Sequence, residues 1–223
     1  MKALAGTRAV LFDLDGTLFD TRADIAAAAN ATRRHFGEAE RPVDEIASFV
    51  GDGGRHLIAR TFDIELADPR MDSLMAVFIE HYVVHAYRYA TWIPGARDVL
   101  LALEGAVVGL VTNKTRRVTE ALLALADLPR SFDVVVAGGD GVLKPDPWSM
   151  HHASKSLGIP CSELVLVGDG PQDVGAARAA GVKSVAYTGG FHPAEQVRKL
   201  PADVIVEDMG ELVAWARDLP RNS

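Results

Sequence analysis

Short apolar runs recur along the chain, and segments with other patterns separate them. Six of these runs consist mainly of Val, Leu, Ala, Ile and Phe, without the alternation of a half-exposed strand. They span residues 9–12, 106–112, 132–138, 164–168, 184–187 and 203–206. Continuous apolar runs of this length are typical of strands that are buried on both faces. The pattern therefore predicts a sheet that is covered by other elements on each side.

Helical patterns lie between several of these runs. One segment opens at Asp146-Pro147 and closes at Gly158, and a second closes at Gly181. Proline in the first turn and glycine just past the last turn are good start and stop signals for a helix. Strands that alternate with single helices imply right-handed crossovers. We therefore expect an α/β fold with a doubly wound parallel sheet as its Rossmann-like core.

Residues 20–90 follow a different pattern, with helical spacing and no convincing strand. Three or four helices account for the apolar positions of this segment. Asp68 is expected to cap one of them, with Pro69 at the first helical position. We therefore predict a small α-helical cap domain, residues 20–90, inserted after the first strand of a core formed by residues 1–19 and 91–223.

Composition and charge narrow the class of protein. The 223 residues are 48% hydrophobic and 24% charged, an ordinary globular balance that argues against disorder. The net charge of −7 suits a phosphate backbone poorly, so we expect no nucleic-acid partner. No apolar stretch approaches membrane-spanning length, Asp13 follows Lys2 and Arg8 too soon for a secretory signal, and the single Cys161 cannot form an internal disulfide. We expect a cytoplasmic protein without a membrane partner, either a monomer or a homodimer.

Chemically active side chains follow the predicted strands at the edge where open parallel sheets bind ligands, beyond the carboxyl ends. Four carboxylates, a hydroxyl and a lysine gather there. They are Asp13, Asp15, Asp169, Asp173, Thr112 and Lys144. Carboxylates that share a site repel one another, and Mg²⁺ with oxygen ligands relieves this repulsion. We expect Asp13, Asp169 and Asp173 to be the metal ligands, which leaves Asp15 free to carry a proton.

Plainer explanations exist for several of these residues. Asp13 and Asp15 can stabilise the turn that follows the strand, and Lys144 can be a solvated loop lysine. The strand before Gly168-x-Gly170 also resembles half of a dinucleotide-binding turn. Asp173 counts against that alternative, because it puts a negative charge where a pyrophosphate would lie.

Together, these residues resemble the four motifs of the haloacid dehalogenase-like hydrolases. Their order and approximate spacing match along nearly the whole chain, and the helical insert resembles the small cap domain of that family. Residues 93–103, 111–115 and 167–182 are similar to segments of the phosphoglycolate phosphatase branch. One departure is Gly170, which stands where relatives often carry serine or aspartate. A second is the short loop before Lys144. Neither departure removes a catalytic group.

The resemblance implies a phosphatase that hydrolyses a small phosphate monoester, a phosphoglycolate phosphatase-like enzyme. Asp13 would be the nucleophile that forms an aspartyl-phosphate, and Asp15 would be the general acid and then the general base. Thr112 and Lys144 would hold the phosphoryl oxygens. These roles agree with the physical chemistry, because a carboxylate nucleophile divides one hard hydrolysis into two easier steps.

The resemblance also implies Mg²⁺ as the cofactor. Asp13, the backbone carbonyl of Asp15, and Asp169 would bind it, with Asp173 close behind. The remaining predicted substrate contacts are Gly16, Thr17, Asn113 and Arg55. Of these, Arg55 lies in the predicted cap, where it can meet a substrate carboxylate or simply be a solvated helix arginine.

Two other functions stay open at this level. A sugar-phosphate mutase of the same superfamily, β-phosphoglucomutase-like, uses the same two aspartates, although the triplet Thr112-Asn113-Lys114 favours the phosphatases. A dinucleotide-binding oxidoreductase is the alternative from another class. The sequence does not determine which phosphate ester is the physiological substrate.

Overall fold

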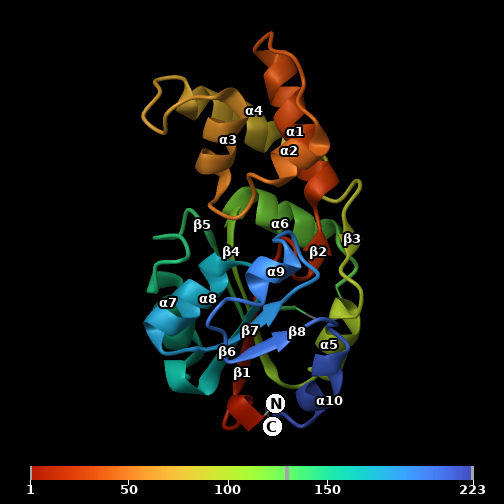
Figure 1. Ribbon diagram of the computed structural model, residues 1–223, viewed down its shortest axis with the longest axis vertical. Helices are drawn as coiled ribbons and strands as arrows, with labels where there is room; N and C mark the ends of the chain where they lie inside the picture. The colour runs from red at the N-terminus through yellow and green to blue at the C-terminus, as the bar shows by residue number, and fades with distance from the viewer. Residues whose placement is uncertain (1, 129–130, 222–223) are drawn as a thin grey trace.

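The computed structural model describes residues 2–128 and 131–221, and its core is a parallel sheet (Figure 1). Within these residues the sheet has six strands in the order β5-β4-β1-β6-β7-β8. The strands are β1 (Ala9–Phe12), β4 (Val107–Thr115), β5 (Val134–Gly138), β6 (Leu164–Gly168), β7 (Lys183–Tyr187) and β8 (Val204–Val206). Every neighbouring pair is parallel. The predicted doubly wound α/β fold is confirmed, and each predicted apolar run overlaps a strand.

Helices cover both faces of the sheet, as the continuous apolar runs require. Side chains of β1 alternate between two apolar clusters: Val10 and Phe12 belong to one, and Ala9 and Leu11 belong to the other. The first cluster includes residues of α5 (Ala96–Ala102), α6 (Arg116–Leu125) and α10 (Glu211–Arg217). The second includes residues of α7 (Trp148–Leu157) and α8 (Pro171–Ala180). The short helix α9 (Ala194–Val197) lies between β7 and β8 in the chain.

A helical insert separates β1 from the rest of the core and extends away from the sheet (Figure 1). It contains α1 (Arg22–His35), α2 (Val43–Ala47), α3 (Gly54–Phe62) and α4 (Met71–Val84). Two short strands, β2 (Phe19–Asp20) and β3 (Thr91–Trp92), pair antiparallel where the chain leaves the core and returns to it. The sequence pattern predicted the helices but not these strands, because two residues are too few to show a periodicity.

Two element boundaries differ from the predicted ones. Helix α4 begins at Met71 rather than at Pro69, because the carboxylate of Asp68 accepts the backbone N–H of Arg70 and closes a turn before the helix. Strand β4 continues to Thr115, three residues past the predicted end, and therefore carries Lys114. The predicted stops of α7 and α8 are confirmed by glycines in the left-handed conformation. Among the described helices, none is long and apolar enough to cross a membrane.

Candidate active site

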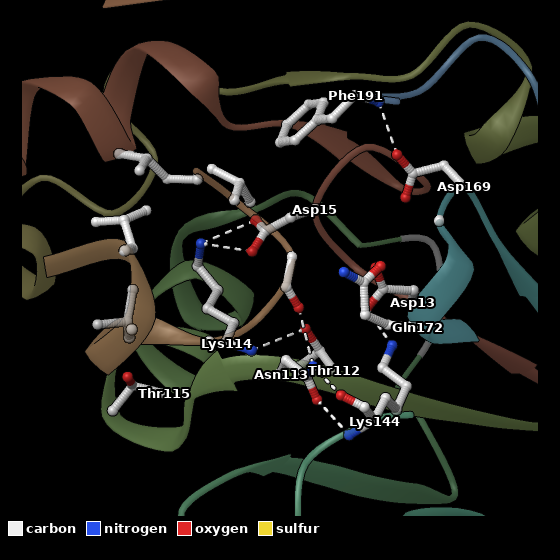
Figure 2. A pocket seen from close by; sticks show the side chains of 18 of the residues that line it. Asp13, Asp15, Thr112, Asn113, Lys114, Thr115, Lys144, Asp169, Gln172 and Phe191 are labelled. Atoms are coloured by element: carbon white, nitrogen blue, oxygen red, sulfur yellow. Dashed lines mark hydrogen bonds and ion pairs between the residues drawn. The ribbon is translucent and has the colours of Figure 1, made fainter. Parts of the chain in front are cut away.

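The carboxyl ends of β1, β4 and β6 open into a cavity that the helical insert covers (Figure 2). The insert contributes apolar side chains from α1, α3 and α4 and the loop before α3. The polar residues that the sequence predicted at this sheet edge all line the cavity. They are Asp13, Asp15, Thr112, Lys144, Asp169 and Asp173. The rule that ligands bind beyond the strand ends therefore located the cavity correctly.

The turn after β1 positions both aspartates. The backbone N–H of Asp13 donates to the carbonyl of Val167, at 2.9 Å, so Asp13 still belongs to the ladder between β1 and β6. The chain then turns around Leu14, whose carbonyl accepts three backbone N–H groups. Gly16 has a φ of 82°, and a Cβ atom there would lie 2.5 Å from Oδ2 of Asp169. Only glycine fits this turn without moving a predicted metal ligand.

Lys144 is buried at the centre of the site, with 4% of its surface exposed. Its ammonium donates to Oδ1 of Asp13 at 2.8 Å, to Oδ1 of Asp173 at 2.5 Å and to the carbonyl of Val111 at 2.8 Å. All three of its protons therefore have acceptors. The alternative of a solvated loop lysine is excluded.

The charges of these groups influence one another. Burial raises the pKa of Asp13 to about 6, although the ammonium of Lys144 opposes the rise. Burial also disfavours the charged form of Lys144, but the carboxylates of Asp13 and Asp173 outweigh it and raise the pKa of the ammonium. Lys144 therefore stays protonated at neutral pH and keeps a positive charge beside the proposed nucleophile.

Asn113 fastens the loop that carries Lys144. Its Oδ1 accepts the backbone N–H of Lys144 at 2.8 Å, and its Nδ2 donates to the carbonyl of Lys144 at 2.9 Å. The same Nδ2 donates to the carbonyl of Gly51 in the insert, also at 2.9 Å. The peptide bond between Lys144 and Pro145 is cis. The Asn113 amide thus joins three segments of the site, and its predicted contact with substrate stays a prediction.

Three carboxylates form a group that suits a hard divalent cation. Asp13, Asp169 and Asp173 each offer an oxygen atom, and these atoms lie within 4.8 Å of one another. Three carboxylates beside the single ammonium of Lys144 leave an excess of negative charge in a buried site. A cation that takes oxygen ligands compensates this charge. The donor set therefore fits the predicted Mg²⁺. The carboxylate of Asp15 is not in this group.

Asp169 and Asp173 are held by hydrogen bonds from the surrounding backbone and side chains. Oδ2 of Asp169 accepts the backbone N–H of Phe191 at 2.6 Å, and Oδ1 accepts the hydroxyl of Thr17 at 3.3 Å. Oδ2 of Asp173 accepts the backbone N–H of Gly170 at 3.1 Å. The start of α8 thus already holds a carboxylate, where a dinucleotide would place its pyrophosphate.

Gly16 and Thr17 lie behind Asp169 rather than in the cavity wall. Thr17 is fully buried, and neither residue is among the described residues that line the cavity. Both support a predicted metal ligand, and their predicted contacts with substrate stay predictions. Thr112 does line the cavity, and its hydroxyl accepts the backbone N–H of Lys114 at 3.2 Å.

Asp15 has partners of its own, separate from the carboxylate group. Its Oδ1 accepts the hydroxyl of Thr21 at 2.6 Å, and the ammonium of Lys114 lies 2.8 Å and 3.1 Å from its two oxygens. Lys114 also donates to the hydroxyl of Tyr82 on α4, at 2.6 Å. The two aspartates that follow β1 therefore lie in different surroundings, each with its own lysine.

Several residues that line the cavity were not predicted as site residues, namely Lys114, Gln172, Tyr82, Phe191 and His192. Phe191 and His192 follow β7, so the rule about strand ends would have found them had it been applied to this strand. The nearby carboxylate of Asp169, 3.8 Å from Nδ1, raises the pKa of His192 against the effect of burial. Lys114 lies two positions after the predicted strand of residues 106–112, but no sequence pattern indicates its partner.

Arg55 lies outside the cavity. It is on α3, its side chain is 52% exposed, and its guanidinium forms an ion pair of 2.7 Å with Asp72. It is not among the described residues that line the cavity. Its predicted contact with a substrate carboxylate stays a prediction.

Comparisons with known proteins relate this chain to one family of hydrolases. A model of the haloacid dehalogenase-like hydrolase family matches residues 10–187. A phosphoglycolate phosphatase of Cupriavidus necator is 37% identical over 211 residues, 92% of this chain and 91% of that protein. An N-acetylmuramic acid 6-phosphate phosphatase of Pseudomonas aeruginosa is 35% identical over 212 residues, 92% of this chain and 93% of that protein. The fold matches a solved structure of a predicted phosphoglycolate phosphatase from Haemophilus somnus with a TM-score of 0.84 and 22% identity, over 95% of this chain and 98% of that one.

Proposed function

Because this chain belongs to the haloacid dehalogenase-like hydrolases, we propose that it hydrolyses a small phosphate monoester of a carboxylic acid, with phosphoglycolate as the model substrate. The observation that carries the proposal is the separation of the two aspartates after β1. Asp13 contacts Lys144 and belongs to the cluster of three carboxylates that suits a cation. Asp15 also faces the cavity, but its partners are different. The two relatives support the substrate class, since both of their names describe phosphate esters of carboxylic acids.

In the first step, a carboxylate oxygen of Asp13 attacks phosphorus and the bond to the ester oxygen breaks. Asp15, in its protonated form, gives its proton to the departing alkoxide, and the product is an alcohol and an aspartyl-phosphate. In the second step, Asp15 takes a proton from water, and the resulting hydroxide attacks phosphorus. Inorganic phosphate leaves, and Asp13 is restored as a carboxylate.

The other residues stabilise charge and hold the phosphoryl group. Lys144 keeps a positive charge 2.8 Å from the nucleophile, and the hydroxyl of Thr112 lines the same cavity. Asp13, Asp169 and Asp173, with the backbone carbonyl of Asp15, would hold Mg²⁺. Mg²⁺, when bound, neutralises negative charge on the carboxylates and on the transferring phosphoryl group.

We assign residues 20–90 as a cap that covers the substrate. The apolar side chains that the insert places over the cavity support this role, because they exclude water from the phosphoryl group. The single cysteine, Cys161, is free, which supports the cytoplasmic location that we propose.

A screen of phosphate monoesters with Mg²⁺ tests the proposed function. We expect the highest kcat/KM on small esters that carry a carboxylate near the phosphate, and no turnover by Asp13→Asn. A wild-type protein that hydrolyses none of the esters, or one that moves phosphate between two positions of a sugar instead of releasing it, would overturn the proposal.

A further inference from the structure

Lys114 is a buried cation paired with the residue that the proposed function uses for proton transfer. Its side chain is 4% exposed and lies at the end of β4, under α4 of the insert. Its ammonium contacts both carboxylate oxygens of Asp15 (Figure 2). It also donates a hydrogen bond to the hydroxyl of Tyr82. Within the described structure, Asp15 is the one carboxylate in ion-pair contact with it. The proposed mechanism assigns no task to this second lysine.

The pairing between Lys114 and Asp15 cannot last through the reaction. Asp15 must be protonated in order to give a proton to the leaving oxygen, and a protonated carboxyl group no longer balances an ammonium. Tyr82 cannot replace it, because burial raises the pKa of the phenol and keeps it neutral. A buried charge without a counter-ion is strongly unfavourable. The step that needs the acid therefore also needs a new anion beside Lys114.

The other described carboxylates of the cavity are engaged elsewhere. Asp13 and Asp173 contact Lys144, and Asp169 accepts hydrogen bonds from Phe191 and Thr17. The protein thus offers no second carboxylate to Lys114 among the residues described at this cavity. The substrate is the remaining source of an anion.

Distances determine where that anion must be on the substrate. The leaving oxygen has to lie roughly 2.6–3.2 Å from Asp15 for proton transfer. The ammonium of Lys114 is 2.8 Å and 3.1 Å from the oxygens of the same carboxylate. A group attached to the carbon that bears the leaving oxygen is therefore within reach of Lys114. In the phosphate ester of a 2-hydroxy acid, that group is the carboxylate.

We propose that Lys114 binds the carboxylate of the substrate and thereby selects phosphate esters of 2-hydroxy acids. The inference rests on the proposed function, because it assumes that Asp15 protonates the leaving oxygen. On binding, Lys114 exchanges the Asp15 carboxylate for that of the substrate, and Asp15 is released to carry its proton. A neutral ester leaves Lys114 unpaired in the acid step, so the same contact also disfavours esters without a carboxylate.

The other cations near the site are less suited to this task. Lys144 has its three protons occupied by Asp13, Asp173 and a backbone carbonyl. The ring of His192 is directed to the carboxylate group, with Nδ1 at 3.8 Å from Asp169. Arg55 lies outside the cavity wall with Asp72 as its partner.

Kinetics with two esters of equal length test the inference. Phosphoglycolate carries the carboxylate, and ethyl phosphate has a methyl group in its place. We expect Lys114→Met to lower kcat/KM for phosphoglycolate by about a hundredfold, mainly through KM, the loss typical of one desolvated charge pair. Ethyl phosphate should not be hydrolysed more slowly, and its kcat/KM should rise, because the variant no longer leaves an ammonium unpaired in the acid step. Lys114→Arg should retain part of the preference for phosphoglycolate. Lys155→Met, at an exposed position of α7, is the matched control and should behave as the wild type.

An equal fall on both esters would overturn the inference, because it would show that Lys114 only positions Asp15. Unchanged kinetics on both esters would overturn the inference as well.

Calorimetry provides a second readout that needs no turnover. It compares the affinity for phosphoglycolate of Asp13→Asn with that of the double variant Asp13→Asn, Lys114→Met. If the wild type hydrolyses neither ester, the proposed function fails. The difference in phosphoglycolate affinity between the two variants still decides the role of Lys114. Thermal melting of each variant identifies a loss of folding, in which case Lys114→Arg carries the comparison.

Discussion

Gln172 of the core donates a hydrogen bond of 2.8 Å to Asp52 of the helical insert. Gln172 lies on α8, one position before Asp173, and Asp52 lies in the loop that leads to α3. The other oxygen of Asp52 accepts the guanidinium of Arg60 at 2.6 Å, so this carboxylate joins α3 to the core. Burial raises and these hydrogen bonds lower the pKa of Asp52, and the net shift is downward. The contact holds the insert over the cavity.

Removal of this contact should weaken the covered state. We expect Gln172→Ala to raise KM for phosphoglycolate by about three- to tenfold, the effect of losing one hydrogen bond to a charged group. The kcat on a small aryl phosphate should change little, because the residues that react are untouched. Steady-state kinetics measure both values. Gln196→Ala, at an exposed position of α9, is the control, and an unchanged KM in Gln172→Ala would contradict the expectation.

Removal of Mg²⁺, the proposed cofactor, should abolish the activity. Excess EDTA is expected to stop turnover and added Mg²⁺ to restore it, while Ca²⁺ should support it poorly because it is larger and less demanding in geometry. Mg²⁺ should also raise the melting temperature of the wild type but not that of Asp169→Asn, which lacks one of the proposed ligands. Full activity in excess EDTA would refute the proposal that the three carboxylates bind a metal ion required for activity.

Substitution of the two aspartates after β1 should impair catalysis in different ways. Asp13→Asn lacks the proposed nucleophile and should lose several orders of magnitude in kcat, with no aspartyl-phosphate trapped after rapid quenching. Asp15→Asn should be slowed most on alkyl esters, whose leaving oxygen needs a proton, and least on aryl esters. Rates for a series of esters with graded leaving groups provide the measurement. An equal loss across the series is the result that an acid role does not permit.

Arg55 provides a direct choice between two expectations. A contact with the substrate carboxylate requires Arg55→Ala to lower kcat/KM for phosphoglycolate by about ten- to a hundredfold. Its half-exposed ion pair with Asp72 instead leads us to expect a change of less than about twofold, since such pairs contribute little. Kinetics on phosphoglycolate and on an aryl phosphate decide between them. A fall confined to phosphoglycolate would return Arg55 to the substrate site.

The ion pair of Asp140 and Arg116 should make the folded protein sensitive to acid. Hydrogen bonds from Arg116 lower the pKa of Asp140, which also accepts the backbone N–H of Ala137. A lowered pKa stabilises the folded state above the unfolded value of 3.8, and this stability is lost as the pH falls through the folded pKa. Because solvent screens this partly exposed pair, Asp140→Asn should cost less than about 1 kcal/mol of unfolding free energy at pH 7 and progressively less below pH 4. Urea unfolding at pH 7 and at a pH below 4 measures this loss of stability. Asp127→Asn, at a highly exposed position, is the control.

Local patterns in the sequence determined the fold and the positions of most candidate site residues. Buried parallel strands appear as continuous apolar runs, and the carboxyl ends of such strands meet at one edge. Asp13 and Asp169 directly follow two of these runs and Lys144 lies in the loop beyond a third, so the sequence placed them at the edge where the cavity lies. The stops at Gly158 and Gly181 were equally readable, because a glycine is the residue that a left-handed helix end favours.

The tertiary structure decided which side chains meet. Lys114 contacts Asp15 across 99 positions of the chain, and Gln172 contacts Asp52 across 120. No periodicity links such residues, because their distance depends on how the insert packs on the core and on how far β4 continues past its apolar run. The partner of Arg55 was also decided by the tertiary structure. Its position in the sequence is compatible with a substrate contact, but its side chain forms an ion pair with Asp72. Local periodicity and turn chemistry thus determine the elements, whereas contacts between distant segments determine which charges are paired in the site.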